Sequence, residues 1–199
     1  MAIKESIIAK ASRCVDEVYP SINDLNAPFL PIEQFVDEAA EWVIKMVPVR
    51  SLGQGISIDV DNAVVSDDMG RMPLPEGFMR LISFKCEDWL RPVVFPIYDS
   101  DPAYVQQWNP YLRGTAHRPV VALCEGETIL EFFPATDDAA ANMRYFGFQP
   151  KTDSSWECIP EKLVPVIAWK TAEAVLTSIS SYTQAQACQA KVNELIQAL

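Results

Sequence analysis

Histidine is almost absent from this chain of 199 residues, which has only His117, and its five cysteines form no CxxC pair. Zinc sites need several imidazole or thiolate ligands at short spacing, so the sequence predicts no zinc site. An acidic stretch from Asp59 to Gly70 has the length of a calcium loop. However, Val64 stands where the EF-hand turn needs glycine, and Gly70 replaces the bidentate glutamate of the twelfth position. We interpret this stretch as a solvated acidic turn and expect no bound metal.

Glycine is also scarce, and neither G-x-x-x-x-G-K-[ST] nor G-x-G-x-x-G occurs among the seven glycines. No G-x-S-x-G nucleophile elbow is present. His117 lies in the stretch GTAHRP, where a pairing with one of the cysteines stays open, although an ordinary loop or interface residue is the simpler interpretation. The sequence therefore predicts no catalytic residue and no cofactor, and it favours a protein that is not an enzyme.

Basic residues are few: 16 lysines and arginines stand against 27 acidic residues, which gives a net charge of −11. Such a charge repels nucleic acid and disfavours ordinary DNA binding. An acidic surface that only surrounds DNA is a different case, because repulsion from the walls of a pore keeps the DNA from sticking as it moves.

No apolar run approaches the roughly 18 to 20 residues that span a bilayer, and the charged start of the chain lacks a signal-peptide core. We therefore expect neither membrane insertion nor secretion. The cysteines are odd in number and scattered through apolar or helical stretches, which predicts reduced thiols in a cytoplasmic setting: Cys14, Cys86, Cys124, Cys158 and Cys188.

Helical periodicity is present at both ends of the chain. Residues 2–18 carry apolar side chains at helical spacing, and a loop from Tyr19 to Leu30 separates them from a second helix that opens at Pro31 and ends at Pro48. A third helical pattern starts near Pro160, weakens over residues 178–181 and continues from Thr183 to Leu199.

Between these helices, from about Ile56 to Phe148, the pattern changes to short β-branched and aromatic runs separated by turn residues: ISIDV, NAVVS, FMRLISFKC, PVVFPIY, PVVALCE, TILEFFP and MRYFGFQ. They predict a mainly antiparallel sheet, with loops over 135–143 and 149–155. The expected fold class is α+β, in which N-terminal helices and a long C-terminal helical segment flank a β-rich insert. We place the helical part at 1–55 and 160–199 and the insert at 56–159.

Within the insert, DSDPAYVQQWNPYLRG predicts a helical turn opened by Asp99 or Ser100, followed by a loop that ends in proline and glycine. Three aromatic side chains of this stretch are candidates for a recognition surface: Tyr104, Trp108 and Tyr111.

The layout of two N-terminal helices, a β-rich insert and a two-part C-terminal helix resembles the head–tail connector (adaptor) proteins of tailed bacteriophages. Two segments within residues 73–133 are similar to the central region of ring proteins from crAss-like phages: PLPEGFMRLISFKCEDWLRPV and DPAYVQQWNPYLRGTAHRPVVAL. The resemblance implies a structural subunit of the virion neck that assembles in the host cytoplasm. It implies a homo-oligomeric ring, typically dodecameric, below the portal protein, with further tail proteins bound and DNA passing through the lumen without sequence-specific contacts.

In such adaptors the C-terminal helical segment extends to dock against the portal. By this analogy the interface candidates are Trp169, Val192, Leu195, Ile196 and Leu199, although the same residues can instead pack inside their own subunit. Two alternatives stay open: a cytoplasmic enzyme of unrecognised type that uses carboxylates and His117, or a host protein-interaction module.

Overall fold

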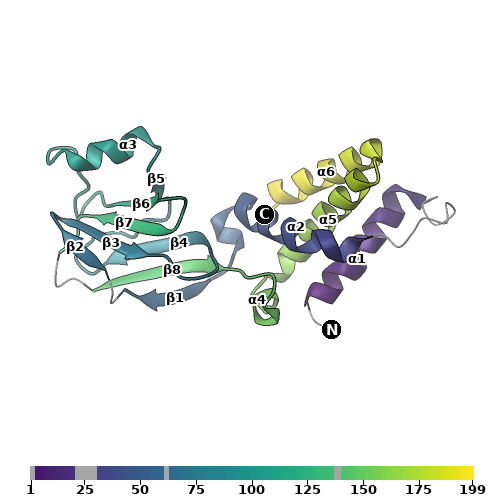
Figure 1. Cartoon of the computed structure of the whole chain (residues 1–199), viewed down its shortest axis with the longest axis horizontal. Helices are drawn as coiled ribbons and strands as arrows, with labels where there is room; N and C mark the ends of the chain where they lie inside the picture. The colour runs from purple at the N-terminus through teal and green to yellow at the C-terminus, as the bar shows by residue number, and fades with distance from the viewer. Residues whose placement is uncertain (1–2, 21–30, 61–62, 137–139) are drawn as a thin grey trace. The chain divides into compact units, whose positions relative to one another are not determined.

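Two groups of elements, one helical and one β-rich, make up this α+β protein in a computed structural model that describes residues 3–20, 31–60, 63–136 and 140–199 (Figure 1). The expected fold class is confirmed. Contacts within the chain define a helical unit, Met1–Gly53 with Phe148–Leu199, and a β-rich unit, Gln54–Gly147. The predicted loop from Tyr19 to Leu30 lies almost wholly outside the described residues.

The helical unit is built around the helix Val164–Ser178. Its elements are α1 (Ile3–Val18), α2 (Ile32–Met46), η2 (Val49–Ser51), α4 (Asp153–Glu157), η4 (Glu161–Leu163), α5 (Val164–Ser178) and α6 (Tyr182–Gln197). Helix α5 packs against α1, α2 and α6. It is apolar on most sides, and Thr171, its one fully buried polar residue, donates its hydroxyl to the carbonyl of Ile167 at 2.8 Å.

The weak helical pattern at residues 178–181 corresponds to a chain reversal. Ser180 takes a left-handed conformation with φ 61°, its N–H bonds the carbonyl of Thr177 at 3.0 Å, and the Ser181 N–H bonds that of Leu176 at 2.9 Å. These two bonds form a Schellman motif, which ends α5. Helix α6 then packs on α5 and on α1. The C-terminal helix therefore lies against its own unit, whereas the resemblance implied a segment that extends to dock against a portal.

The predicted loop over 149–155 is also too long, because α4 begins at Asp153. Tertiary contacts of Trp156 stabilise this short helix. Its indole N–H donates to the carbonyl of Pro150 at 2.9 Å, and its ring meets Phe148 edge-on at 5.0 Å.

The β-rich unit contains two sheets. The first is three-stranded, in the order β1 (Ile56–Asp59), β8 (Ala141–Gly147), β4 (Phe78–Cys86). The second is five-stranded, in the order β2 (Val64–Ser66), β3 (Met69–Pro73), β7 (Ile129–Phe133), β6 (Val120–Cys124), β5 (Ile97–Tyr98). All pairings are antiparallel except that of β5 with β6. The mainly antiparallel character is thus as expected.

Two strand assignments differ from the sequence patterns. Strand β3 has the sequence MGRMP, whose glycine and proline disfavour a strand, yet it pairs with β2 and β7. Strand β8 starts at Ala141, inside the predicted loop 135–143, because it pairs on both sides with β1 and β4. In both places long-range pairing outweighs local propensity.

Residues of both sheets share one hydrophobic core, with an aromatic cluster of Phe84, Trp89 and Phe132 inside it. The Phe132 ring lies 4.7 Å from that of Phe84 and 6.3 Å from that of Trp89. Gly70 makes room for this ring, because a Cβ on Gly70 would lie 2.0 Å from the ring carbon Cζ of Phe132. The glycine of β3 is therefore a packing requirement of the core.

Candidate subunit interface

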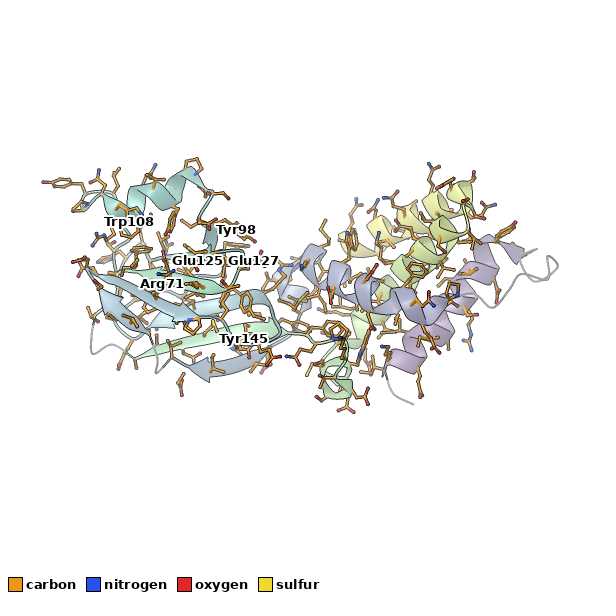
Figure 2. All side chains as sticks on the ribbon, viewed as in Figure 1. Arg71, Tyr98, Trp108, Glu125, Glu127 and Tyr145 are labelled. Atoms are coloured by element: carbon orange, nitrogen blue, oxygen red, sulfur yellow. The ribbon has the colours of Figure 1, made fainter. Side chains whose placement is uncertain are left out.

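The β-rich unit exposes large apolar side chains along one stretch, residues 90–112, which we call the aromatic segment (Figure 2). Among the described residues, 13 large hydrophobic side chains are exposed, and eight of them fall in this segment: Leu90, Val94, Phe95, Tyr98, Val105, Trp108, Tyr111 and Leu112. Tyr111 is 95% exposed and Phe95 78%. Single exposed apolar residues are common, and such a concentration makes this segment a candidate interaction surface.

The first half of the segment follows the edge of both sheets. Val93 and Phe84 exchange two backbone hydrogen bonds of 2.8 Å, and Ile97 and Tyr98 form the two-residue edge strand β5 beside β6. The run PVVFPIY was predicted as a full strand, but only its last two residues are one. Pro92 and Pro96 explain this, since neither has an N–H to donate to a ladder, and their spacing was the signal that this run stays at the surface.

The second half begins with the short helix α3 (Pro102–Val105), which continues into η3 (Gln106–Trp108). The cap of α3 is Asp101, not Asp99 or Ser100 as predicted from the sequence, and its carboxylate accepts the N–H of Ala103 at 2.8 Å. Asp101 is preferred because Pro102 then occupies the first helical position, where its missing N–H costs nothing.

Buried polar groups hold the loop after α3 in place. Gln107 is almost fully buried, and its side chain donates to the carbonyl of Ala103 at 3.0 Å and accepts the N–H of Gly114 at 2.8 Å. Arg113 donates to the carbonyl of Gln107 at 2.9 Å and to that of Asp67 at 2.6 Å. The loop is therefore ordered before any partner binds, which lowers the entropic cost of association.

Tyr104 anchors the same loop to the sheet. It is half-buried, and its hydroxyl donates to Glu131 at 2.7 Å, while Arg71 lies 3.6 Å from the other carboxylate oxygen of Glu131. Burial and the hydrogen bond to Glu131 raise the pKa of the Tyr104 phenol, so the phenol stays protonated and remains the donor. Tyr104 therefore positions the recognition surface, and its ring meets Trp108 edge-on at 6.4 Å.

The other two aromatic candidates point outward. Trp108 is 53% exposed, and the loop beyond it turns on Asn109, whose side chain accepts the N–H of Tyr111 at 3.0 Å. Rigid, exposed tryptophan and tyrosine side chains are the residue types that most often dominate binding energy at interfaces. Trp108 and Tyr111 thus remain candidate contact residues of this unit.

The C-terminal candidates are divided by burial. Val192 on α6 is 1% exposed, so we withdraw it as a contact, whereas Trp169 on α5 is 9% exposed and keeps only a small accessible surface. Leu195, Ile196 and Leu199 are half-buried and keep part of their surface accessible. The sequence candidates are therefore distributed over both units, Tyr104, Trp108 and Tyr111 lying together in the β-rich unit.

Sequence reasoning missed the exposed residues on the first half of the aromatic segment, Leu90, Val94, Phe95 and Tyr98. Their strand-like pattern resembles that of a buried strand. The two prolines, Pro92 and Pro96, are the one sequence signal that distinguishes this run from a buried strand.

Among the described residues, the side chains considered for enzyme chemistry form no common cluster. His117 is exposed in a turn closed by hydrogen bonds between Thr115 and Arg118. Asp67 and Asp68 form the two-residue turn between β2 and β3, both with positive φ as a type I′ hairpin requires. Across the described residues, no three histidine, cysteine or acidic side chains gather as metal ligands do.

Within the described residues, no helix has the length and apolarity to cross a bilayer.

Four of the cysteines are buried thiols, and only Cys158 is exposed. Burial is the main cause that raises their pKa from 9.0, to about 11 for Cys14 and Cys124 and to about 12 for Cys86 and Cys188.

We expect these thiols to make the protein sensitive to alkali. A pKa that is higher in the folded than in the unfolded state stabilises the fold fully below the unfolded value, and this contribution is lost as pH rises through the folded value. The free energy of unfolding, measured by denaturant titration, should therefore fall between pH 9 and about pH 12. Cys188→Ala should flatten this decline and Cys158→Ala should leave it unchanged. An equal decline in both variants would contradict the assignment.

Comparison with known proteins adds no relative, since no protein-family model matches the chain and no curated protein matches it significantly.

Proposed function

We propose that this chain is a non-enzymatic structural subunit that assembles with copies of itself, as the head–tail connectors of tailed bacteriophages do. The observation that carries the proposal is the aromatic segment, where a pre-ordered loop presents Trp108 and Tyr111 to a partner. The resemblance of residues 73–133 to ring proteins of crAss-like phages supplies the finer reading: a ring, typically of twelve copies, below the portal in the virion neck.

The charge of the chain supports this reading. With a net charge of −11, a ring of this subunit repels the phosphate backbone and allows DNA to pass without binding. The half-buried Leu195, Ile196 and Leu199 at the end of α6 are the side chains that we assign to contact with the portal or a further neck protein.

The proposal is tested by native mass spectrometry and light scattering of the purified chain, alone and with a portal protein. We expect the unmodified chain to form a large closed assembly or to join one on the portal. The double variant Trp108→Ser/Tyr111→Ser should assemble at least about tenfold more weakly, because each removes a large exposed apolar surface.

The control is Tyr182→Ser, which removes a similarly exposed aromatic side chain from the helical unit. It should assemble as the unmodified chain does. A chain that stays monomeric with and without the portal would contradict the proposal and favour the enzyme or the host interaction module.

A further inference from the structure

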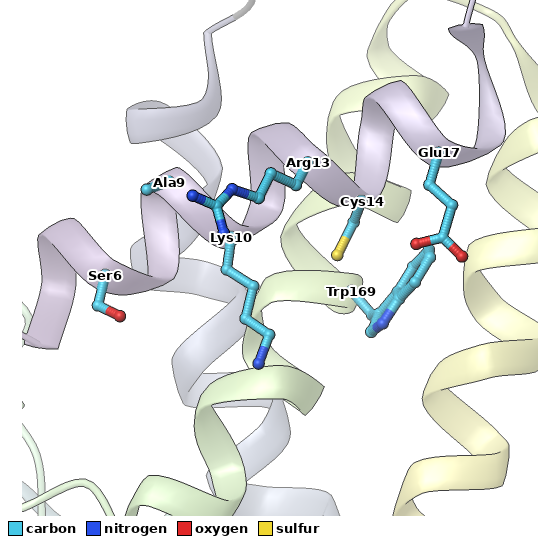
Figure 3. Close-up of a pocket in the computed structure, with 7 residues that line it drawn as sticks. All are labelled: Ser6, Ala9, Lys10, Arg13, Cys14, Glu17 and Trp169. Atoms are coloured by element: carbon cyan, nitrogen blue, oxygen red, sulfur yellow. The ribbon is translucent and has the colours of Figure 1, made fainter.

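The helical unit has a groove of about 460 Å³ that the proposed function does not yet use (Figure 3). Its walls come from α1 and α5: Ser6, Ala9, Lys10, Arg13, Cys14, Glu17 and Trp169. The buried Cys14 and Trp169 give it an apolar floor, while Ala9, Lys10 and Arg13 are exposed at its rim.

The two cations of the groove have no partner within the described residues. Neither Lys10 nor Arg13 takes part in a side-chain hydrogen bond or ion pair there, whereas Lys4, two turns earlier on the same helix, is paired with Asp37 at 2.7 Å. With Glu17 as the one carboxylate of the lining, the groove has two positive charges and one negative, a net charge of +1. In a chain of net charge −11, this local excess favours an acidic ligand with an apolar side chain.

The β-rich unit carries a surface of that chemistry, which we call the acidic edge: Tyr98, Asp99, Glu125 and Glu127. Tyr98 pairs with Leu123 in the sheet, and the Asp99 carboxylate accepts the N–H of Glu125 at 3.1 Å, so the β6–β7 turn lies beside Tyr98 (Figure 2). Arg71 forms an ion pair with Glu125 as well as with Glu131. Asp99 and Glu127 remain exposed without a cationic partner among the described residues.

We propose that the acidic edge of one copy docks into the groove of a second copy, with Tyr98 over the apolar floor and Asp99 and Glu127 facing Lys10 and Arg13. This inference rests on the proposed function, which requires copies of the chain to associate. A volume of about 460 Å³ is enough for one tyrosine side chain, and ligand pockets of about 300–1,000 Å³ are common.

Charge also decides the geometry of the contact. Pairing two grooves brings cations together, and pairing two acidic edges brings carboxylates together, so both self-pairings are disfavoured. The favourable contact joins two different surfaces, and such a head-to-tail contact produces a ring when the rotation between copies closes.

Charge reversal tests the contact. The groove variant is Lys10→Glu/Arg13→Glu, and the edge variant is Asp99→Lys/Glu127→Lys. Each alone should self-associate at least about tenfold more weakly in native mass spectrometry, since like charges then face each other. An equimolar mixture of the two variants, and the protein with all four substitutions, should regain assembly because every contact again joins opposite charges.

The matched control is Arg50→Glu/Lys162→Glu, which reverses two exposed cations of the helical unit outside the groove and should assemble normally. Thermal unfolding confirms that each variant folds. If the unmodified chain forms rings and the groove variant does too, this inference is wrong while the proposed function stands. If the edge variant does not restore assembly of the groove variant, the two surfaces are not partners and this inference is wrong. An unmodified chain that never assembles refutes both.

Discussion

Trp89→Ala is expected to lower the free energy of unfolding of the β-rich unit by about 3–5 kcal/mol, the usual cost of truncating a buried aromatic residue. Trp89 is 2% exposed, and its ring lies 5.5 Å from that of Phe84 in the core shared by both sheets. Its indole N–H also donates to the carbonyl of Pro134 at 3.0 Å, so the substitution leaves a cavity and an acceptor without its donor.

The matched control is Trp108→Ala, the same substitution at an exposed tryptophan of the same unit. It should change the unfolding free energy by no more than about 0.5 kcal/mol, as is usual at surface positions. Denaturant titration, with hydrogen exchange to assign the effect to the β-rich unit, measures both variants. Similar losses in the two would show that the aromatic segment is part of the core and would weaken its assignment as an interface.

Val192→Asp is expected to destabilise the helical unit by about 3 kcal/mol or more, because it places a carboxylate without a partner in an apolar interior. Val192 is 1% exposed and lies on the face of α6 that packs against α5, together with Ala185 and Cys188. Thermal unfolding should show a lower midpoint for this unit.

Asn193→Asp is the control, since it adds the same charge one residue further along on an exposed position of the same helix. It should unfold as the unmodified chain does. A Val192→Asp protein that keeps its stability but loses a portal partner would return Val192 to the docking surface. The expected result instead leaves Leu195, Ile196 and Leu199 as the accessible apolar side chains at the end of α6.

Trp89 and Val192 are core residues, whereas Trp108 and Leu195 keep accessible surface, and residue type alone does not distinguish the two groups. Trp89 and Trp108 are 19 positions apart and occur in equally aromatic surroundings, yet one is buried and the other is exposed. The difference arises from the sheets, which enclose Trp89 between Phe84 and Phe132, and from Gln107 and Arg113, which turn the loop outward.

By itself, the sequence determined the elements whose signal is local. Side-chain periodicity within a few residues predicts the helices α1 and α2. Local backbone chemistry accounts for Pro31 and Pro48, which flank α2, and for the break near Ser180. The recognition candidates Trp108 and Tyr111 also came from a local pattern, a proline- and glycine-bounded aromatic loop.

Only the tertiary structure decided the features that depend on residues far apart in the chain. Strand β3 exists because β2 and β7 pair with it, and Gly70 is required there by the ring of Phe132, 62 positions later. The fold-back of α6 buries Val192, and the groove forms where Trp169 meets α1. Burial and pairing are set by the whole packed chain, so no local periodicity encodes them.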